Sequence, residues 1–169
     1  MSQVDLIEAA MGPERDLVRP RFARGVQCFG VRIGGGLAGY GWLSAGPEWI
    51  GEVQLEIRPR PGEAYVWNCV TLAEHRRKGI FRSLLLGISR HARLQGLNRL
   101  WIGSLAIPAE KAIVPMGFLP ALHFDYAAIA GAHLMRVRAS GNRALAADAS
   151  SALAVRPGLL VRGNRRRRH

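Results

Sequence analysis

The alternation of hydrophobic and polar residues predicts four β-strands in the first half of the chain. Segments 26–33 and 37–44 are apolar and flank three consecutive glycines. Because glycine allows the positive φ of a tight turn, these two segments predict a hairpin. Residues 49–57 alternate with period two and predict a third strand. Residues 64–72 are nearly all apolar, as expected of a strand at the centre of a sheet.

Two segments have the 3.6-residue period of an amphipathic helix. Residues 3–18 form the weaker one, which Pro13 interrupts, and the stronger one begins at Ile80. Gly96 is expected to end the second helix as a C-terminal cap. The later pattern predicts a strand at 97–103, a short helix at 108–116 and strands at 118–129 and 133–138.

The hydrophobic pattern fades after residue 139 while positive charge accumulates. The formal net charge is +12. The last thirty residues contain seven arginines and one aspartate, so they carry half of this charge. We therefore expect a single domain over 1–139 and a loosely ordered basic tail over 140–169. Such a tail can neutralise nucleic-acid phosphates or can be a solvated end. No aromatic residues interleave with its arginines, so we expect nucleic-acid binding to be weak at most.

Composition narrows the cellular setting. No apolar run approaches the roughly 20 residues of a membrane-spanning helix. The first ten residues carry two acidic groups and no basic cluster, unlike a signal peptide. These features predict a cytoplasmic protein without a membrane span. Cys28 and Cys69 are then expected to be buried thiols, and no His/Cys spacing indicates a metal site.

The segment with the clearest chemical signal is residues 76–81, Arg-Arg-Lys-Gly-Ile-Phe, between the apolar strand and the long helix. The first N–H groups of a helix lack internal partners, and the helix dipole favours negative charge there. Gly79 has no side chain to obstruct a phosphate, and the neighbouring basic residues add positive charge. The segment suits a pyrophosphate, although a basic helix start after a glycine turn is an equally simple interpretation of these six residues alone.

The surrounding sequence resembles motif A of the GNAT superfamily of acyl-CoA-dependent N-acyltransferases, Arg/Gln-x-x-Gly-x-Gly/Ala after a central strand. Arg76 and Gly79 match its first two fixed positions, and Phe81 replaces the second small residue. Gly117-Phe118 resembles the end of motif B, and the elements over about 25–138 follow the family order. The resemblance implies an α/β (α+β) fold: a mixed, mostly antiparallel sheet of six to seven strands, flanking helices, and central strands splayed at the cofactor site.

The same resemblance implies the cofactor and its contacts. Acetyl-CoA or another acyl-CoA would lie with its pantetheine arm along free backbone groups of Val70 and Leu72, one of whose N–H groups would stabilise the oxyanion. The pyrophosphate would bind the amides of residues 77–82. The expected cofactor-binding residues are Val70, Thr71, Leu72, Arg76, Arg77, Lys78, Gly79, Ile80, Phe81 and Arg82.

The catalytic groups are less clearly indicated. Glu52 and Glu56 alternate onto one face of the third strand, and Glu63 opens the fourth strand with Tyr65 two residues later. We take Glu56, Glu63 and Tyr65 as candidates for proton transfer, although sheet-edge carboxylates are commonly only solvated. The motif B positions at which the family has Asn, a small polar residue and Tyr are occupied by Ala106, Ala109 and Ile113. That tyrosine would protonate the departing thiolate.

Three functions remain open at this point. The first is acetyl or other acyl transfer to a primary amine of a small molecule or peptide. The second is a CoA-binding or interaction module with weak or no catalysis, since motif B is degenerate. The third is a basic nucleic-acid-associated domain, which the motif A match disfavours. The sequence does not set the oligomeric state, and a homodimer is compatible with it.

Overall fold

The computed structural model describes residues 2–104, 107–129 and 132–163. The chain divides into two compact units, residues 1–48 with 59–116 and residues 49–58 with 117–169. The fold is mixed α+β with mostly antiparallel sheets and flanking helices, as the sequence predicts. The division between the units does not fall at residue 140, where a domain was expected to give way to a tail.

A four-stranded sheet with the order β1-β2-β5-β6 forms the centre of the first unit. Its strands are β1 (Gln27–Ile33), β2 (Gly36–Ser44), β5 (Glu63–Thr71) and β6 (Arg99–Ile102). The first three pair antiparallel, whereas β5 and β6 run parallel. The predicted hairpin is confirmed, and its turn places Gly34 and Gly35 at φ values of 56° and 84°.

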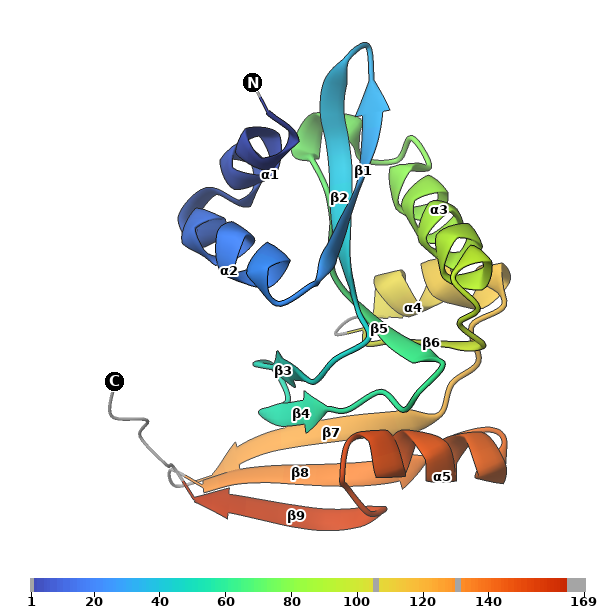
Figure 1. Cartoon of the computed structure of the whole chain (residues 1–169). Coiled ribbons are helices and arrows are strands. Elements are labelled where there is room, and N and C mark those ends of the chain that lie inside the picture. The colour runs from blue at the N-terminus through green and yellow to red at the C-terminus, as the bar shows by residue number, and fades with distance from the viewer. Residues whose placement is uncertain (1, 105–106, 130–131, 164–169) are drawn as a thin grey trace. The chain divides into compact units, whose positions relative to one another are not determined.

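Helices cover both faces of this sheet (Figure 1). One face is covered by α1 (Gln3–Met11), the 3-10 helix η1 (Gly12–Leu17) and α2 (Val18–Ala23), and the other by α3 (Ile80–Leu94). The single helix expected over 3–18 is thus divided, because Pro13 lies in the first turn of η1. Buried apolar side chains of α1 and α2 pack on Tyr40 and Trp42 of β2.

Two glycines of β2 allow α3 to approach the sheet closely. A Cβ on Gly39 would lie 2.7 Å from the carbonyl oxygen of Val70 and 2.8 Å from Cγ2 of Ile80. A Cβ on Gly41 would lie 2.8 Å from Sγ of Cys69. The first residue of α3, and therefore the turn before it, is held against the centre of the sheet.

The long helix ends where the sequence predicts. Gly96 adopts φ 74°, and the N–H of Leu97 donates to the carbonyl oxygen of Ala92 at 2.9 Å. Together with the bond from the Gly96 N–H to the Arg93 carbonyl oxygen, this is a Schellman cap. The unit continues through β6 to α4 (Ile107–Ile113) and the 3-10 helix η3 (Val114–Met116).

The prediction of a single third strand over 49–57 is wrong. The segment instead forms β3 (Glu48–Ile50) and β4 (Leu55–Ile57), which pair with each other in a separate two-stranded sheet. A turn divides them, in which the Gln54 N–H donates to the Gly51 carbonyl oxygen and Gln54 adopts φ 49°. Consequently β2 pairs directly with β5.

The expectation of a loosely ordered tail from residue 140 is also wrong for the residues that the structure describes. After β7 (Leu122–Ile129) and β8 (Ala132–Ala139), the chain forms α5 (Arg143–Ala152) and β9 (Gly158–Gly163). Asn142 caps α5 by accepting the Ala144 N–H at 2.8 Å, and β9 pairs antiparallel with β8. The arginines at 165–168 lie outside the described residues.

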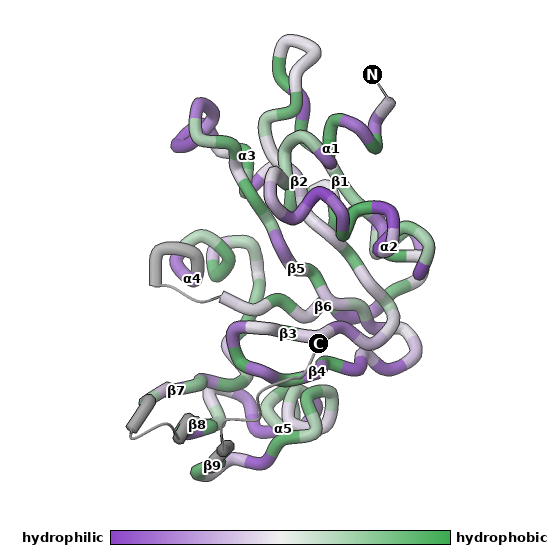
Figure 2. Tube along the Cα trace, turned by 90° about the vertical axis from the view of Figure 1, so that its left-hand side faces the viewer, coloured by the Kyte–Doolittle hydropathy of each residue, from purple (hydrophilic) through white to green (hydrophobic). Residues whose placement is uncertain are grey.

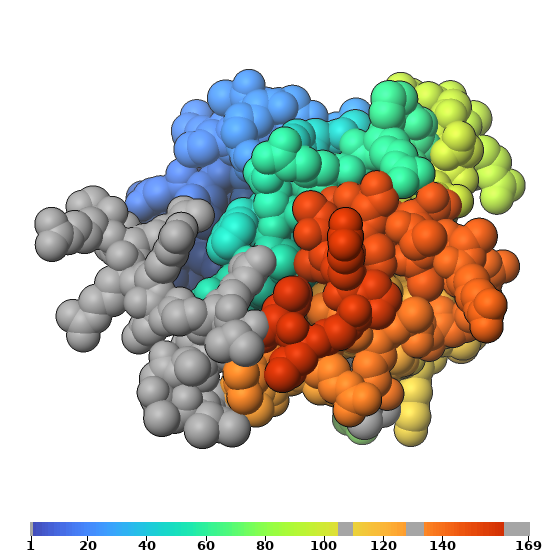
Figure 3. All heavy atoms as spheres, turned by 90° about the horizontal axis from the view of Figure 1, so that it is seen from below, coloured from blue at the N-terminus to red at the C-terminus, as the bar shows by residue number. Residues whose placement is uncertain are grey.

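These C-terminal elements share a core with Leu55 of β4. Met135, Val137 and Val155 are buried together, and Leu153 and Leu160 pack against them. In the space-filling view, residues of α5, β8 and β9 form one closely packed orange-to-red body (Figure 3). The sequence pattern missed this part because α5 buries mainly alanines, which give a weak hydrophobic period.

Candidate functional site

The first backbone N–H groups of α3 have no hydrogen-bond acceptor within the helix. Gly79 is the N-cap at φ 74°, and no side chain caps the helix. The first bond of the helix runs from the Ser83 N–H to the Gly79 carbonyl oxygen at 3.0 Å. The amides of residues 80–82 therefore have no acceptor within the helix, which makes this end a place for an anion.

Basic residues surround this helix end. Arg76, Arg77 and Arg82 are exposed, and the tube in Figure 2 is hydrophilic where the chain enters α3. Arg77 adopts φ 62°, a left-handed conformation that costs a non-glycine residue about 1–2 kcal/mol. The Lys78 ammonium donates to the carbonyl oxygen of Glu74 at 2.9 Å, so its side chain is folded back onto the loop.

A pocket of about 270 Å³ lies at this loop. Its lining consists of one residue from β5, three residues of the loop, the first three residues of α3 and one residue of α4: Thr71, Arg76, Arg77, Gly79, Ile80, Phe81, Arg82 and Ala112. The structure thus brings Thr71 together with six of the other cofactor-binding candidates. Val70, Leu72 and Lys78 do not line this pocket.

The strand that leads to the pocket has a free edge. Parallel pairing with β6 covers only Glu63 to Val66 of β5, opposite Arg99 to Ile102. In the described part of the chain, residues 67–71 of β5 have no strand partner on that side. This is the splaying of the central strands that the family resemblance implies.

The pairing of β5 with β2 shows which backbone groups of β5 face this edge, and they are not the predicted ones. The Leu72 N–H is not free, because it donates to the carbonyl oxygen of Ala38 in β2 at 3.0 Å. The carbonyl oxygen of Val70 also faces β2, beside Gly39. Since backbone groups alternate in direction along a strand, both the N–H and the C=O of Thr71 face the free edge. The backbone groups at the free edge therefore belong to Thr71, and not to Val70 and Leu72 as predicted.

An irregularity in β5 lies two residues beyond its last pair with β6. Trp42 pairs with Trp67 and Tyr40 pairs with Val70, so β5 has one extra residue between these pairs. Asn68 adopts φ 44° at this bulge. Its side chain is thereby directed differently from that of a regular strand residue.

Glu63 is a structural carboxylate. Its side chain is buried and accepts three hydrogen bonds, from the Trp101 indole at 2.8 Å, the Arg99 guanidinium at 3.0 Å and the Arg60 backbone N–H at 3.2 Å. These bonds join the start of β5 to β6 and to the preceding turn. A carboxylate satisfied in this way is a poor general base, which argues against the first catalytic candidate of this strand.

The other two catalytic candidates occupy different settings. Tyr65 is buried in β5, with its hydroxyl 3.3 Å from where a Cβ on Gly103 would stand. Glu56 belongs to β4 in the second unit and accepts from Nε of Arg58 at 2.7 Å. The motif B position at Ile113 is a buried apolar side chain, and Ala106 lies outside the described residues.

A polar cluster that the sequence did not indicate lies on the α1–α2 side of the sheet. Arg21 of α2 is 6 % exposed, and its guanidinium stacks on Trp67 at 4.2 Å and on Trp42 at 4.9 Å. Glu14 of η1 lies 3.9 Å from this guanidinium and 3.5 Å from the side-chain amide of Asn68. These contacts join residues up to 54 positions apart, so no local pattern could have revealed them.

Burial is the main cause of the pKa shifts of the groups around this cluster. Burial raises the pKa of Tyr40, a shift that Glu14 increases and Arg21 opposes. Burial likewise lowers the pKa of Arg21. Cys28 and Cys69 are free thiols that are half-buried rather than fully buried as predicted, and desolvation by the surrounding side chains raises the pKa of each to about 12.

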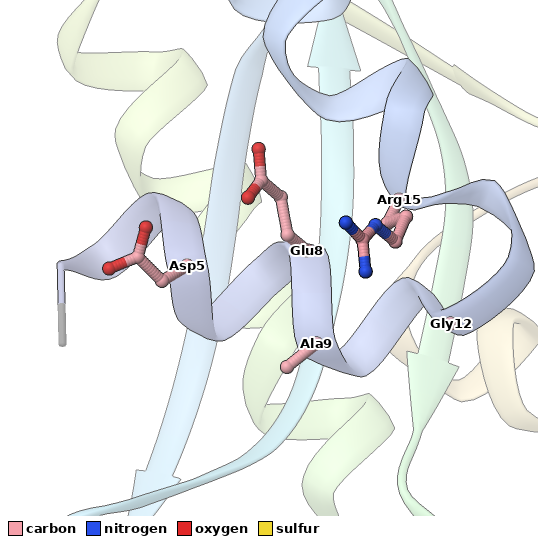
Figure 4. Close-up of a pocket in the computed structure, with 5 residues that line it drawn as sticks. All are labelled: Asp5, Glu8, Ala9, Gly12 and Arg15. Carbon is pink, nitrogen blue, oxygen red and sulfur yellow. The ribbon is translucent and has the colours of Figure 1, made fainter.

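A second hollow, of about 480 Å³, lies against α1 and η1. Figure 4 shows its lining residues, Asp5, Glu8, Ala9, Gly12 and Arg15. Its carboxylates already have partners, since Asp5 accepts from the Ser2 backbone at 2.7 Å and Glu8 pairs with Arg19 at 2.8 Å. None of these lining residues belongs to β5, so the hollow is separate from the pocket at the start of α3.

Comparison with known proteins identifies the family. The model of the acetyltransferase (GNAT) family matches residues 6–113. The fold is similar to that of a GCN5-related N-acetyltransferase from Ralstonia eutropha JMP134, with TM-score 0.51 and 22% identity over 73% of this chain and 78% of that one. It is also similar to a probable acetyltransferase, with TM-score 0.51 and 16% identity over 70% and 76% of the two chains. A search of curated proteins gives no match.

The chain therefore belongs to the GNAT acetyltransferase family. The matched region includes the splayed strand, the basic loop and α3, which are the elements that carry the resemblance in the sequence. It also includes most of α1 and all of α2, so the N-terminal helices are part of the family domain. None of the helices described in the structure is both long and apolar enough to cross a membrane.

Proposed function

We propose that this protein is an N-acetyltransferase that transfers the acetyl group of acetyl-CoA to a primary amine. The observation that carries the proposal is the pocket in which the Thr71 edge of β5 meets the amides at the start of α3 that have no acceptor within the helix. One end of this pocket suits a pyrophosphate and the other suits an extended, amide-containing arm. Family membership supports the same assignment. We place the reaction in the cytoplasm.

The phosphate end is formed by backbone more than by side chains. The amides of residues 80–82 would donate to the phosphate oxygens, with Arg76, Arg77 and Arg82 adding positive charge. The Lys78 side chain has another task, because its bond to Glu74 holds the loop. The left-handed conformations of Arg77 and Gly79 set the path of the loop around this end of the helix.

The arm of the cofactor would extend β5 as an added strand. The Thr71 N–H would donate to an arm carbonyl and the Thr71 carbonyl would accept from an arm amide. From Thr71 to the bulge at Asn68 is three residues, or roughly 10 Å of strand. The thioester would then lie near the bulge, where β5 has left β6.

Acetyl transfer at that point requires two proton movements. The nitrogen of the neutral amine attacks the thioester carbon, the C–N bond forms and the carbonyl oxygen becomes an oxyanion. A backbone N–H on the free edge of β5 would stabilise that oxyanion. The C–S bond then breaks, CoA leaves as a thiolate, and the nitrogen loses one proton, which finally reaches the sulfur; the other proton movement is the earlier loss of one proton from the alkylammonium to solvent, which gives the neutral amine.

The binding step is tested by thermal denaturation and calorimetry with acetyl-CoA. Ligand at about 100 times its dissociation constant should stabilise the protein by roughly 2.7 kcal/mol. Mass spectrometry of the purified protein should detect a co-purified CoA species. Absence of both a thermal shift and a calorimetric signal would overturn the proposal. Turnover is tested by release of free thiol from acetyl-CoA in the presence of primary amines.

A second candidate function keeps the cofactor and omits efficient catalysis. It is favoured by Ile113, a buried apolar residue where the family resemblance places a thiolate-protonating tyrosine. This version predicts a strong thermal shift with acetyl-CoA and no thiol release with any amine. The two functions are therefore separated by the same pair of measurements.

A further inference from the structure

The η1 segment brings a carboxylate to the irregular part of β5. Glu14 is 59 % exposed at its side chain, and its Oε2 lies 3.5 Å from Nδ2 of Asn68. Asn68 is the bulge residue, two positions beyond the last pairing of β5 with β6. A carboxylate from the N-terminal helices thus stands beside the point where the strand edge becomes free.

The contacts of Glu14 are loose, in contrast to those of Glu63. The bond to Asn68 is at the outer limit of hydrogen bonding, and the Arg21 guanidinium is 3.9 Å away. Glu63 is instead buried and accepts three shorter bonds. A proton acceptor must be reachable and must not be saturated with donors, so Glu14 satisfies a condition that Glu63 fails.

Arg21, which faces Glu14, is buried and has contacts on several sides, whereas Glu14 itself is mostly exposed. Arg21 is fixed by stacking on Trp42 and Trp67 and by a 3.6 Å contact of its guanidinium with the sulfur of Met11. The buried Nε1 of Trp67 has no hydrogen-bond partner among the described residues. A buried donor without a partner is uncommon, and here it lies next in the chain to Asn68.

We propose that Glu14, Trp67 and Asn68 frame the amine subsite, and that Glu14 receives the proton of an alkylammonium substrate before it attacks the thioester. The proposal rests on the acetyltransferase function proposed above. The carboxylate first pairs with the ammonium, then accepts one of its protons directly or through one water. The amine nitrogen, now with a free electron pair, attacks the thioester carbon, and protonated Glu14 returns the proton to solvent. Arg21 is a positioning residue, which holds the carboxylate toward β5.

Several charged or titratable groups influence Glu14 and must be considered in its pH behaviour. Arg21 of α2 lies 3.9 Å from it, and the negative charge of Glu14 contributes to the raised pKa of Tyr40 of β2. Glu48 and Cys28 act on Arg21. Arg15 and Asp16 are its neighbours in η1, exposed and paired with each other at 3.7 Å. Glu14 keeps its contact with the side-chain amide of Asn68 in the presence of all these groups.

The experiment compares Glu14→Gln with wild type in thiol release from acetyl-CoA, with tyramine, spermidine, ethanolamine and glycinamide as amine probes. For an accepted amine, kcat of Glu14→Gln should fall by about 100-fold or more at pH 7. The wild-type advantage should shrink as pH approaches the pKa of the amine, about 10 for the alkylamines and about 8 for glycinamide, because the amine then arrives unprotonated. The thermal shift caused by acetyl-CoA should be unchanged.

Asp16→Asn is the matched control, since it removes the same charge from the same short helix and should retain wild-type kcat. Unchanged kcat in Glu14→Gln, or an equal loss at all pH values, would overturn the role of Glu14 and leave the acetyltransferase assignment intact. No thiol release by wild type with any probe, despite acetyl-CoA binding, would overturn both. Arg21→Lys should raise KM while preserving the pH dependence, which a purely structural loss would not do.

Discussion

The backbone N–H of Leu72 donates to the carbonyl oxygen of Ala38 at 3.0 Å, and this bond sets which backbone groups of β5 face the free edge. Because direction alternates along the strand, Thr71 rather than Leu72 presents its N–H and C=O to the pocket. A displacement of one residue exchanges every such group between the two edges. The proposed cofactor contacts therefore depend on this register.

Proline substitutions test that register, because proline removes one N–H. Leu72→Pro should lower the Tm by about 3 °C or more, since a bond to β2 is lost and the Ala38 carbonyl is left without its donor. Thr71→Pro should lower the Tm less and weaken acetyl-CoA binding at least tenfold in calorimetry. The reverse pattern would show that Leu72 supplies the cofactor contact.

Two glycines of the same region should respond oppositely to alanine. Gly79 has φ 74°, so Gly79→Ala should destabilise the protein by about 1 kcal/mol. Gly87 lies within α3, so Gly87→Ala should stabilise it by about 0.5–1 kcal/mol. Neither new Cβ meets an atom within 4 Å, so the difference isolates backbone conformation. Chemical denaturation measures both changes.

The same pair separates stability from binding. Gly79→Asp adds a negative charge where the phosphates are expected and should nearly abolish the thermal shift given by acetyl-CoA. Gly87→Asp adds the same charge to an exposed position farther along α3 and should retain most of that shift. Equal responses of the two aspartate variants would remove the phosphate role from the start of α3.

Replacement of Glu63 should affect folding more than chemistry. Glu63→Ala removes the buried carboxylate that accepts from the indole N–H of Trp101 and from the guanidinium of Arg99. The loss should be about 3–5 kcal/mol in the free energy of unfolding, measured by urea denaturation. Glu56→Ala, at a carboxylate with a more exposed side chain, should cost less than about 1 kcal/mol. A stable but inactive Glu63→Ala protein would restore Glu63 as a catalytic group.

Truncation tests the order of the C-terminal segment. Deleting 157–169 removes β9, which pairs with β8 and contributes Leu160 to the core of the second unit. The Tm should fall by more than about 5 °C. Deleting only 164–169 leaves β9 complete and should change the Tm little. Equal, small effects of both deletions would show that β9 adds nothing to stability.

The two thiols should be slow to react in the native protein. Burial raises the pKa of Cys28 and Cys69 from 9.0 to about 12. At pH 8 the native thiolate fraction is then about 1000-fold below that of the unfolded chain, and alkylation by iodoacetamide should slow accordingly. Single Cys28→Ser and Cys69→Ser variants assign the two rates. Rapid alkylation in native buffer would contradict the burial of the thiol concerned.

The sign of the linked stability change follows from the same shift. Between pH 9 and 12 the unfolded chain loses its thiol protons and the native protein retains them. The unfolded state then binds fewer protons, so stability should fall as pH rises through this range. The double serine variant should show a smaller fall, measured by urea denaturation at each pH.

The sequence by itself determined the elements that local chemistry specifies. The glycine turn at 34–36, the stretch that becomes α3 and its cap at Gly96 each depend on neighbouring residues, and each is found where the pattern predicts it. The strand, basic loop and helix of motif A are adjacent in the chain, so the family could be inferred without coordinates. Asn142 and the alanines of α5 carry a local signal too weak to predict that helix.

Only the tertiary structure decided what depends on distant partners. The free edge of β5 belongs to Thr71 because of a bond to Ala38, and Glu63 is structural because Arg99 and Trp101 reach it across the sheet. Glu14 meets Asn68 across 54 residues of sequence. Strand register and burial arise from packing between segments, and a one-dimensional pattern contains neither quantity.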